Sequence, residues 1–390
     1  MDSPSDDRIR LVVLFGGQSA EHDVSCTTAA HVLAAVDPDR YEIEAIGITR
    51  EGRFVRAGAA EELLTSSARS LPPDTVPEAG GPAEDSAGPA ELAPLVPTGP
   101  STELMSSVGA LAESHQVVVL PLLHGPLGED GTVQGLCELA DVAYVGAGVL
   151  GSAATMDKVM AKTILASHGI PQTRWRAVHE RDVTADAKAV AKDVAADLGL
   201  PCFIKPANMG SSVGVSKAAD IDEIETAMAA ALRYDEWLVL EEAVDAREIE
   251  VSVLGNETLE LSVPGEIIPG ADFYDYEDKY VDGQAELVIP ADLPEPVVER
   301  IHELAAEAYR ALRVEGMARA DFLHEEGGRG PLLNELNTIP GFTPISMYPK
   351  LWEASGLSYA DLIDRLVDLA IERHRRRSGK RITARDPRGN

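Results

Sequence analysis

The first fifty residues alternate between apolar runs and a helical segment, and this order restricts the folds that the chain can adopt. Residues 9–15 form an apolar run that ends at two glycines, residues 25–35 have helical spacing, and residues 41–49 form a second apolar run. A strand, a helix and a strand in succession place two parallel strands in one sheet, because the helix returns the chain along the face of the sheet. The opening therefore predicts an α/β domain with a parallel sheet.

The same alternation resumes after an interruption. Residues 67–103 are rich in Pro, Ala, Gly, Glu and Ser and almost without aromatic side chains, which is typical of a disordered or low-complexity insertion. Beyond them, a helical segment at 132–140 separates apolar runs at 116–123 and 143–146. We expect the N-terminal domain to cover residues 1–150.

Two further units and a tail follow. Each unit mixes strands with helices, and we expect one over residues 151–245 and another over residues 246–375. Residues 376–390 form a basic tail, and the arginines from Arg373 onward are typical of a frayed, solvated chain end. The predicted strands lie at 173–178, 202–205, 213–217, 238–242, 248–254, 259–264, 317–323 and 332–337, and the predicted helices at 152–167, 183–198, 221–231 and after residues 296 and 358.

Composition and charge exclude several classes of function. The formal net charge of -31 repels nucleic-acid phosphates and anionic lipids, so we expect neither nucleic acid nor a membrane as a partner. The longest apolar run, residues 117–123, contains a proline and is far shorter than the roughly 20 residues that span a bilayer. Residues 1–7 lack the positive region of a secretory signal, so we expect a cytoplasmic protein.

Cysteines and glycine-rich segments give no sign of a zinc or dinucleotide site. The three cysteines, Cys26, Cys137 and Cys202, are scattered, and we expect reduced and mostly buried thiols. Residues 146–151 match G-x-G-x-x-G, but residues 166–173 contain no acid to bind a ribose, which disfavours a nicotinamide enzyme. No segment has the spacing of a P-loop.

The strongest signal lies in two apolar runs near the C-terminus that carry polar residues at alternate positions. One run contains Arg319 and Asp321, and the next contains Glu335 and Asn337, with a glycine-rich segment between them. Side chains two apart on a strand share a face, so each pair points to one side. If Asp321 lies opposite Glu335, the turn is centred on Gly328, inside the glycine-rich segment. The spacing predicts a hairpin with a guanidinium and three oxygen ligands on one face.

These oxygen ligands suit magnesium. Cross-strand neighbours lie about 5 Å apart, so Asp321, Glu335 and Asn337 would gather around one point. Carboxylate and amide oxygens are ligands of Mg²⁺, which usually also keeps waters and binds substrate phosphates. The alternative is an exposed hairpin with solvated charges. We favour the metal site, because Asn337 leads into residues 338–343, which are too apolar for a plain surface turn.

A second signal predicts contact with phosphate. Lys205 ends an apolar run, and the segment 206–214 that follows contains Ser211, Ser212 and two glycines. Such a loop can approach a phosphate closely and close over it like a lid. A Gly/Ser loop alone is more often a plain connection, but the adjacent lysine and the metal ligands downstream favour a nucleotide site.

Seven blocks in order resemble the D-alanine-D-alanine ligase family of ATP-grasp enzymes. The resemblance covers almost the whole chain outside residues 67–103 and the basic tail. It implies a two-lobed ATP-grasp unit of the α+β class after the N-terminal parallel-sheet domain. The blocks are 16–25, 124–131, 156–158, Lys205-Pro206 with 210–214, 273–280, 319–321 and 334–341.

The resemblance implies roles in binding ATP and metal. Lys158 and Lys205 would contact the ATP phosphates, and Glu248 would contact the ribose. Two Mg²⁺ ions, for which Mn²⁺ could substitute, would bind the three oxygen ligands of the hairpin. The segment from Glu241 to Val244 would face the adenine, although it lacks the lysine and tryptophan of some relatives. The implied nucleotide-binding residues also include Ser211, Ser212, Glu242, Ala243, Lys279 and Asn334.

The resemblance implies that two molecules of D-alanine are joined for peptidoglycan synthesis. The first would attack the γ-phosphate of ATP to give an acylphosphate and ADP, and the amine of the second would then attack the acyl carbon. Arg319 and the backbone N–H of Gly341 match the donors for the resulting oxyanion.

Other matching residues would hold the two substrates. Glu21 would bind the first ammonium, with Ser211 and Tyr280 linking it to a mobile loop, although the helix dipole alone also favours an acid at a helix start. His124 would lie near the first substrate. The residues that match the binding position of the second carboxylate are Ser346, through its hydroxyl, and Met347, through its backbone N–H.

Three alternatives stay open. The second substrate could be D-lactate or D-serine, although a tyrosine at position 280 favours D-alanine. Another ATP-grasp enzyme would share the ATP and metal residues but not the surroundings of Glu21 and Ser346. A non-catalytic nucleotide-binding protein would tolerate the loss of Arg319. The family also suggests a homodimer, with ATP and D-alanine as its small-molecule partners.

Overall fold

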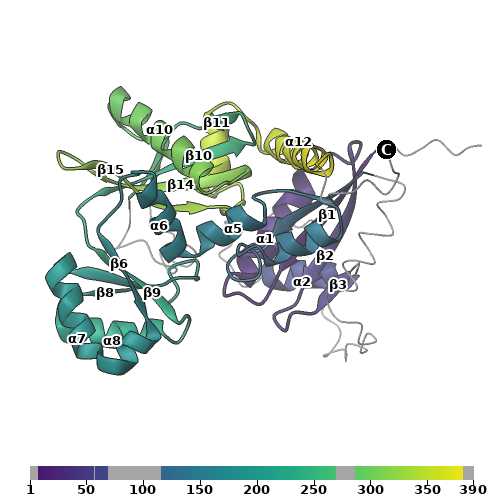
Figure 1. Ribbon diagram of the computed structural model, residues 1–390. Helices are drawn as coiled ribbons and strands as arrows, with labels where there is room; N and C mark the ends of the chain where they lie inside the picture. The colour runs from purple at the N-terminus through teal and green to yellow at the C-terminus, as the bar shows by residue number, and fades with distance from the viewer. Residues whose placement is uncertain (1–7, 57, 69–115, 269–285, 381–390) are drawn as a thin grey trace, which may run out of the picture.

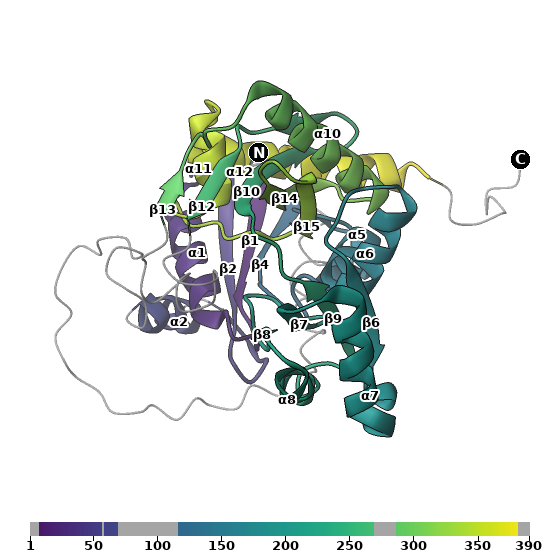
Figure 2. The ribbon, with the colours of Figure 1, turned by 90° about the vertical axis from the view of Figure 1, so that its left-hand side faces the viewer.

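The computed structural model describes residues 8–56, 58–68, 116–268 and 286–380, which form three sheets covered by helices (Figures 1 and 2). Residues 69–103 of the predicted insertion, together with Lys279 and Tyr280, lie outside the described residues. Within the described part of the chain, no helix has both the length and the apolar character that a membrane crossing requires.

The N-terminal sheet has the strand order β3-β2-β1-β4-β5. Its four main strands are parallel, which confirms the predicted parallel sheet, and only the edge strand β3 is antiparallel. Every residue of β4 is buried, as is typical of a parallel strand that is covered on both faces. The elements are β1 (Ile9–Gly16), α1 (His22–Ala35), β2 (Tyr41–Ile48), β3 (Phe54–Arg56), α2 (Gly58–Ala68), β4 (Val117–Leu122), α4 (Thr132–Leu139) and β5 (Ala143–Tyr144).

A four-stranded antiparallel sheet with the order β6-β9-β7-β8 follows. In Figure 1 it forms the lower left lobe, where α7 and α8 cover one of its faces. The strand expected at 213–217 is shorter, because the residues before it form turns in which Ser211 and Ser212 have positive φ. The elements are β6 (Trp175–His179), α7 (Glu180–Leu198), β7 (Cys202–Pro206), β8 (Ser216–Ala218), α8 (Ile221–Ala231) and β9 (Trp237–Glu242).

The third sheet is also antiparallel, with the order β13-β12-β10-β14-β15, and β11 pairs with β10 beside this path. The apolar face of α10 packs on β10, β14 and β15 together with residues of α5 and α6. The elements are β10 (Arg247–Gly255), β11 (Leu259–Leu261), β12 (Gly265–Ile268), β13 (Glu286–Val288), α10 (Glu295–Ala311), β14 (Gly316–Glu325), β15 (Gly330–Asn337), α11 (Met347–Ala354) and α12 (Tyr359–Ser378).

The single helix predicted at 152–167 is two helices, α5 (Val149–Met156) and α6 (Lys158–Ser167). Asp157 separates them with an extended backbone, and its side chain accepts a hydrogen bond of 3.0 Å from the backbone N–H of Met160. A carboxylate at this position satisfies a donor that the first turn of a helix leaves free. The break places Lys158 at the start of α6, facing the loop after β7.

The prediction of a solvated end from Arg373 onward is wrong at its beginning. Helix α12 continues to Ser378, and Arg373 is 3% exposed. The Arg373 guanidinium donates hydrogen bonds to the carbonyls of Tyr144, at 2.7 Å, and Gly146, and its Cζ lies 4.2 Å from the centre of the Tyr144 ring. Because helix periodicity turns Arg373 toward the apolar side of α12, this arginine fastens the helix to the N-terminal sheet.

One hydrophobic core connects the N-terminal sheet with the C-terminal unit. It joins Leu11, Val13 and Phe15 of β1 to apolar residues of α12, and it includes Phe342 and Trp352. Figure 1 shows α12 beside both sheets. This shared core fixes the loops that follow β1 and β4 relative to the hairpin of β14 and β15.

The glycines of the G-x-G-x-x-G segment allow backbones to approach closely at this junction. A Cβ atom added at Gly151 would lie 2.9 Å from the carbonyl oxygen of Arg313, which is too close for any side chain. Gly146 similarly lies against Gly316 at the start of β14. The segment therefore has a packing role in this fold.

Candidate active site

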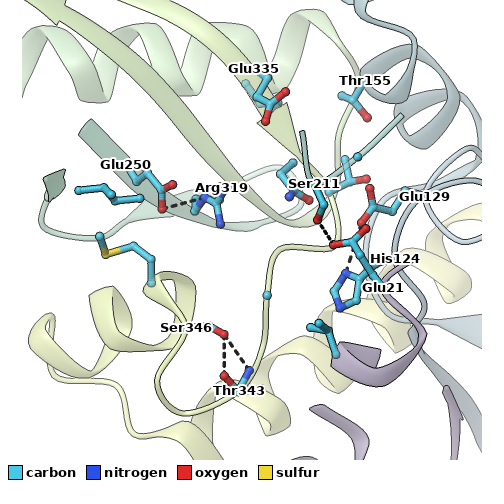
Figure 3. A pocket seen from close by; sticks show the side chains of 18 of the residues that line it. Glu21, His124, Glu129, Thr155, Ser211, Glu250, Arg319, Glu335, Thr343 and Ser346 are labelled. Atoms are coloured by element: carbon cyan, nitrogen blue, oxygen red, sulfur yellow. Dashed lines mark hydrogen bonds and ion pairs between the residues drawn. The ribbon is translucent and has the colours of Figure 1, made fainter. Parts of the chain in front are cut away.

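A cavity of about 520 Å³ is lined by loops after β1, β4 and β7 and by strands β10, β14 and β15 (Figure 3). It brings together many of the residues that the sequence predicted. Of the predicted residues, those that line it are Glu21, His124, Lys158, Ser211, Arg319, Glu335, Asn337, Gly341, Ser346 and Met347. Those outside its lining are Lys205, Ser212, Glu241, Glu242, Ala243, Val244, Glu248, Asp321 and Asn334.

The hairpin has the predicted pairing. Arg319 lies opposite Asn337 and Asp321 lies opposite Glu335, with β14 and β15 antiparallel. The register then shifts, so that Phe322 pairs with Leu333 and Asn334 is the extra residue of a β-bulge. The bulge moves the turn to residues 326–329, half a residue from the predicted centre at Gly328, and leaves the polar face intact.

Arg319 is held by two carboxylates. Its Nε and Nη2 donate hydrogen bonds of 2.7 Å to the two oxygens of Asp321, and Nε also lies 2.9 Å from Oε2 of Glu250. Burial alone would lower the pKa of Arg319, but Asp321 and then Glu250 outweigh it and raise the pKa well above its ordinary value. The guanidinium is therefore a fixed positive charge on the wall of the cavity (Figure 3).

Glu250 was not predicted from the sequence. It lies opposite Asp321 on the neighbouring strand β10, and it is buried beside the cavity. A signal was present, because Glu248, Glu250 and Ser252 alternate with buried apolar residues along one strand. Strand alternation places such residues on one face, although it does not reveal which neighbouring strand they meet.

A cluster of lysines lies beside the cavity. Nζ of Lys162 is 3.2 Å and Nζ of Lys205 is 3.3 Å from the carboxylate of Glu241 at the end of β9. Burial would raise the pKa of Glu241, but Lys162 and then Lys205 lower it to about 2. Lys162 was not predicted, although it follows Lys158 by one helical turn, which is the spacing at which side chains share a helix face.

Lys158 lies between this cluster and the hairpin. Its Nζ donates a hydrogen bond of 2.6 Å to the carbonyl of Met209 in the loop after β7. Burial lowers its pKa, and the nearby carboxylate of Glu335 acts in the opposite direction. Lys158 thus lies near both the residues that were predicted to bind phosphate and those that were predicted to bind metal.

Glu242, the next residue of the predicted adenine segment, binds two arginines and not the lysines that bind Glu241. The carboxylate of Glu242 is bound by Arg174 at 2.8 Å and by Arg329 of the hairpin turn at 2.6 Å. Burial opposes the negative charge, but the backbone N–H of Arg174 and the two guanidinium groups lower the pKa of Glu242. Glu242 therefore joins the central lobe to the hairpin through its side chain.

The loop after β7 folds over the start of α1. Ser211 and Ser212 have φ values of 48° and 58°, a backbone region that residues other than glycine adopt infrequently. The hydroxyl of Ser211 donates a hydrogen bond to Oε1 of Glu21, the pair that the family resemblance implied (Figure 3). Glu21 takes the cap position of α1 but makes no side-chain cap bond. Its carboxylate instead contacts the loop after β7, and the residue lines the cavity.

His124 lies on the wall behind Glu21. Its Nδ1 is 3.1 Å from the carbonyl oxygen of Ile339 and 3.4 Å from Oε1 of Glu129. Burial would lower the pKa of His124, but Glu129 outweighs it and raises the pKa. Within the described chain, Nε2 has no hydrogen-bond partner although it is buried. Because the carbonyl of Ile339 requires a donor, Nδ1 carries a proton.

The N-terminus of α11 forms the opposite wall. Ser346 precedes this helix, and its Oγ lies 2.7 Å from Oγ1 of Thr343 and accepts a hydrogen bond of 3.2 Å from the Thr343 backbone. A Cβ atom at Gly341 would lie 3.1 Å from the same Oγ, so a glycine suits this close approach. Ser346 makes no side-chain cap bond, which leaves the first N–H groups of α11 without a side-chain cap beside the cavity that Ser346 and Met347 line.

Oxygen ligands for a metal are present but are not preassembled as a cluster of acids. Asp321 and Glu335 face each other across the hairpin, and Oδ1 of Asn337 accepts a hydrogen bond of 3.1 Å from the backbone N–H of Ile339. In the described parts of the chain, no three His, Cys, Asp or Glu side chains gather as metal ligands. Both Asp321 oxygens are bound by Arg319, so any metal would share this carboxylate with the guanidinium.

Two family models match this chain, one over its N-terminal domain and one over the two units that follow. The family model described as "D-ala D-ala ligase N-terminus" matches residues 10–147, and the model described as "D-ala D-ala ligase C-terminus" matches residues 164–368. The D-alanine--D-alanine ligase of Thermoanaerobacter sp. (strain X514) is 45% identical over 371 residues, which cover 94% of this chain and 97% of that protein. The corresponding ligase of Geobacillus thermodenitrificans is 43% identical over 378 residues, covering 94% and 96% of the two chains.

Solved structures agree with these relatives. The D-alanine-D-alanine ligase of Coxiella burnetii superposes with a TM-score of 0.74 at 32% identity and covers 95% of this chain and 96% of its own. The VanG D-Ala:D-Ser ligase of Enterococcus faecalis superposes with a TM-score of 0.75 at 30% identity, covering 93% and 99%. The chain therefore belongs to the D-alanine-D-alanine ligase family and has its ATP-grasp fold.

Proposed function

We propose that this chain joins two molecules of D-alanine to give D-alanyl-D-alanine, with ATP converted to ADP and phosphate. The observation that carries the proposal is the convergence on one cavity of a buried carboxylate, a fixed guanidinium and a helix N-terminus. Glu21, Ser211, Arg319 and Ser346 all line this cavity, and the hydroxyl of Ser211 donates a hydrogen bond to Glu21. A cavity of about 520 Å³ accommodates two small amino acids beside phosphate groups.

The residues of the hairpin fit Mg²⁺ in the nature of their donor atoms. Asp321, Glu335 and Asn337 offer carboxylate and amide oxygens, and Mg²⁺ commonly uses one or two carboxylates while phosphates and waters supply the remaining ligands. Two Mg²⁺ ions, or Mn²⁺ in their place, would thus bind these three residues. Bound metal would supply positive charge that lowers the electrostatic cost of bringing a carboxylate to the phosphates.

The first half-reaction activates the first D-alanine. In our proposal Glu21 binds its ammonium, and His124, which lines the cavity, binds near its carboxylate. A carboxylate oxygen forms a bond to the γ-phosphorus, and the bond between that phosphorus and the oxygen of ADP breaks. Lys158 and Lys205 stabilise the charge on the phosphates, while Glu241, Glu242, Ala243, Val244, Glu248, Ser212 and Asn334 contribute to the nucleotide site.

The second half-reaction forms the amide. The neutral amine of the second D-alanine attacks the acyl carbon, and negative charge develops on the former carbonyl oxygen. Arg319 and the backbone N–H of Gly341 stabilise that oxyanion, while Ser346 and Met347 bind the second carboxylate. The carbon–oxygen bond to phosphate then breaks, and the leaving phosphate takes up the proton that the amine releases.

One competition assay tests this proposal. Purified protein receives ATP, Mg²⁺ and D-alanine, with D-serine or D-lactate as competing second substrate, and the products are identified by mass spectrometry. We expect D-alanyl-D-alanine as the main product, and we expect Arg319→Ala to abolish it while ATP affinity is retained. A product that contains D-serine or D-lactate in preference would reassign the second substrate, and ATP binding without any ligation product would overturn the proposal. Homodimerisation stays a prediction from the family.

A further inference from the structure

Lys350 lies on the wall of the cavity, and none of the roles proposed above uses it. It belongs to α11 and borders the cavity together with Thr343, Ser346 and Met347. Its side chain has no hydrogen-bond or ion-pair partner among the residues that the structure describes. The other lysine and the arginine that line the cavity are already engaged, Lys158 with the carbonyl of Met209 and Arg319 with Asp321.

The positive charge of Lys350 is unfavourable in the first turn of α11 when no anion is bound there. Lys350 is the fourth residue of α11, and the first turn of this helix contains no acidic residue. A helix N-terminus carries partial positive charge, so a cation in the first turn opposes the helix dipole. Local rules of this kind are commonly broken where a residue serves a ligand and not the stability of the fold. An anion bound between Lys350 and the N-terminus of α11 would relieve both positive charges.

The walls around Lys350 suit one particular anion. Apolar side chains of Ile267, Leu287 and Ile345 line this end of the cavity, beside the hydroxyls of Ser346 and Thr343. The predicted phosphate residue Lys158 lies instead with Glu335 and the loop after β7. A small carboxylate with a methyl group nearby therefore fits the α11 end better than a nucleotide phosphate does.

We propose that Lys350 binds the α-carboxylate of the second amino acid and makes the enzyme select a nucleophile with a free carboxylate. This inference depends on the proposed function, in which that carboxylate meets Ser346 and Met347. The guanidinium of Arg319 is shared between Asp321 and Glu250, so Lys350 supplies the positive charge that the second substrate requires. Lys350 is thus a specificity-determining residue for the second half-reaction.

The first experiment separates the two half-reactions. Hydroxylamine traps an acylphosphate as a hydroxamate and has no carboxylate, so it reports activation of the first D-alanine without use of the second carboxylate site. For Lys350→Met we expect hydroxamate formation and the KM for ATP to change by less than about twofold. We expect the KM for the second D-alanine to rise by about tenfold, which corresponds to about 1.4 kcal/mol.

The second experiment measures selectivity directly. D-Alaninamide can serve only as the second substrate, because it lacks a carboxylate to activate. The preference for D-alanine over D-alaninamide, as a ratio of kcat/KM values, should fall by about tenfold in Lys350→Met and recover largely in Lys350→Arg. The matched control, Lys192→Met on the exposed face of α7, should keep the ratio of the unchanged protein.

The outcomes distinguish this inference from the proposed function. An unchanged selectivity ratio in Lys350→Met, or an equal loss of hydroxamate and dipeptide, would overturn the role of Lys350 and leave the ligase activity standing. Absence of both hydroxamate and dipeptide with the unchanged protein would instead overturn the proposed function, and this inference with it.

Discussion

Replacing Arg373 by methionine should destabilise the protein by an amount that the structure allows us to estimate. The change removes two hydrogen bonds to the buried carbonyls of Tyr144 and Gly146, and each carbonyl left without a partner costs at least about 1 kcal/mol. The lost contact with the Tyr144 ring adds about 1 kcal/mol. Against this, burial lowers the pKa of Arg373, so replacing it also recovers part of a desolvation cost, and the net loss is smaller than the sum of these contributions.

The net expectation is a loss of about 2 kcal/mol in the free energy of unfolding. This corresponds to a decrease of about 2–3 °C in Tm, because about 2.1 cal/mol/K per residue gives a chain of 390 residues an unfolding entropy of about 0.8 kcal/mol/K. The measurement is thermal unfolding of Arg373→Met beside Arg375→Met, because Arg375 lies two residues away on the exposed side of α12. We expect the control to change Tm by less than about 1 °C. Equal Tm values for the two variants would refute the reasoning that Arg373 fastens α12 to the N-terminal sheet.

Two further predictions concern buried acids of the site. Glu250→Gln keeps the shape of the side chain but removes a carboxylate 2.9 Å from Arg319, and we expect kcat to fall by about tenfold with an unchanged KM for ATP. Steady-state kinetics beside Glu257→Gln, an exposed acid, measures this, and a normal kcat would contradict it. Glu241, whose pKa is lowered from 4.5 to about 2, contributes stability that is present above about pH 4.5 and is lost as the pH falls toward 2. Glu241→Gln should therefore lower Tm at pH 7 by an amount that shrinks at acid pH, and a Tm difference independent of pH would count against the lysine cluster.

Local patterns predicted the elements whose periodicity is long and regular. Strand alternation placed Arg319 and Asp321 on one face, because a period of two fixes the face of every residue on a strand, and the position of the glycine-rich turn predicted that Asp321 pairs with Glu335. The β-bulge at Asn334 was not predictable, because an extra residue in one strand leaves no mark in its composition. The short strands β12 and β13 and the helix α11 were likewise missed, since three to eight residues carry too little periodicity.

Contacts between distant segments were the other feature that could not be predicted from the sequence. Glu250 meets Arg319 only because β10 pairs with β14, and Lys162 meets Glu241 across 79 residues of chain. Arg373 was assigned to a solvated tail because its neighbours are basic, whereas its own side chain follows the apolar face of α12. Asp157 was predictable in principle, because a carboxylate three residues before Met160 is a common helix start. Residue patterns therefore predicted individual segments well. Which charged residues meet in the site depends on how distant segments pair, and the sequence does not show that pairing.

The most direct test of the central claim follows an oxygen atom. D-Alanine labelled with ¹⁸O in its carboxylate is incubated with ATP, Mg²⁺ and the purified protein, and the dipeptide and inorganic phosphate are analysed by mass spectrometry. If the carboxylate of the first D-alanine attacks the γ-phosphorus, one labelled oxygen should appear in the phosphate for each D-alanyl-D-alanine formed. Dipeptide formation with phosphate free of label would contradict the acylphosphate route and the roles proposed for this cavity.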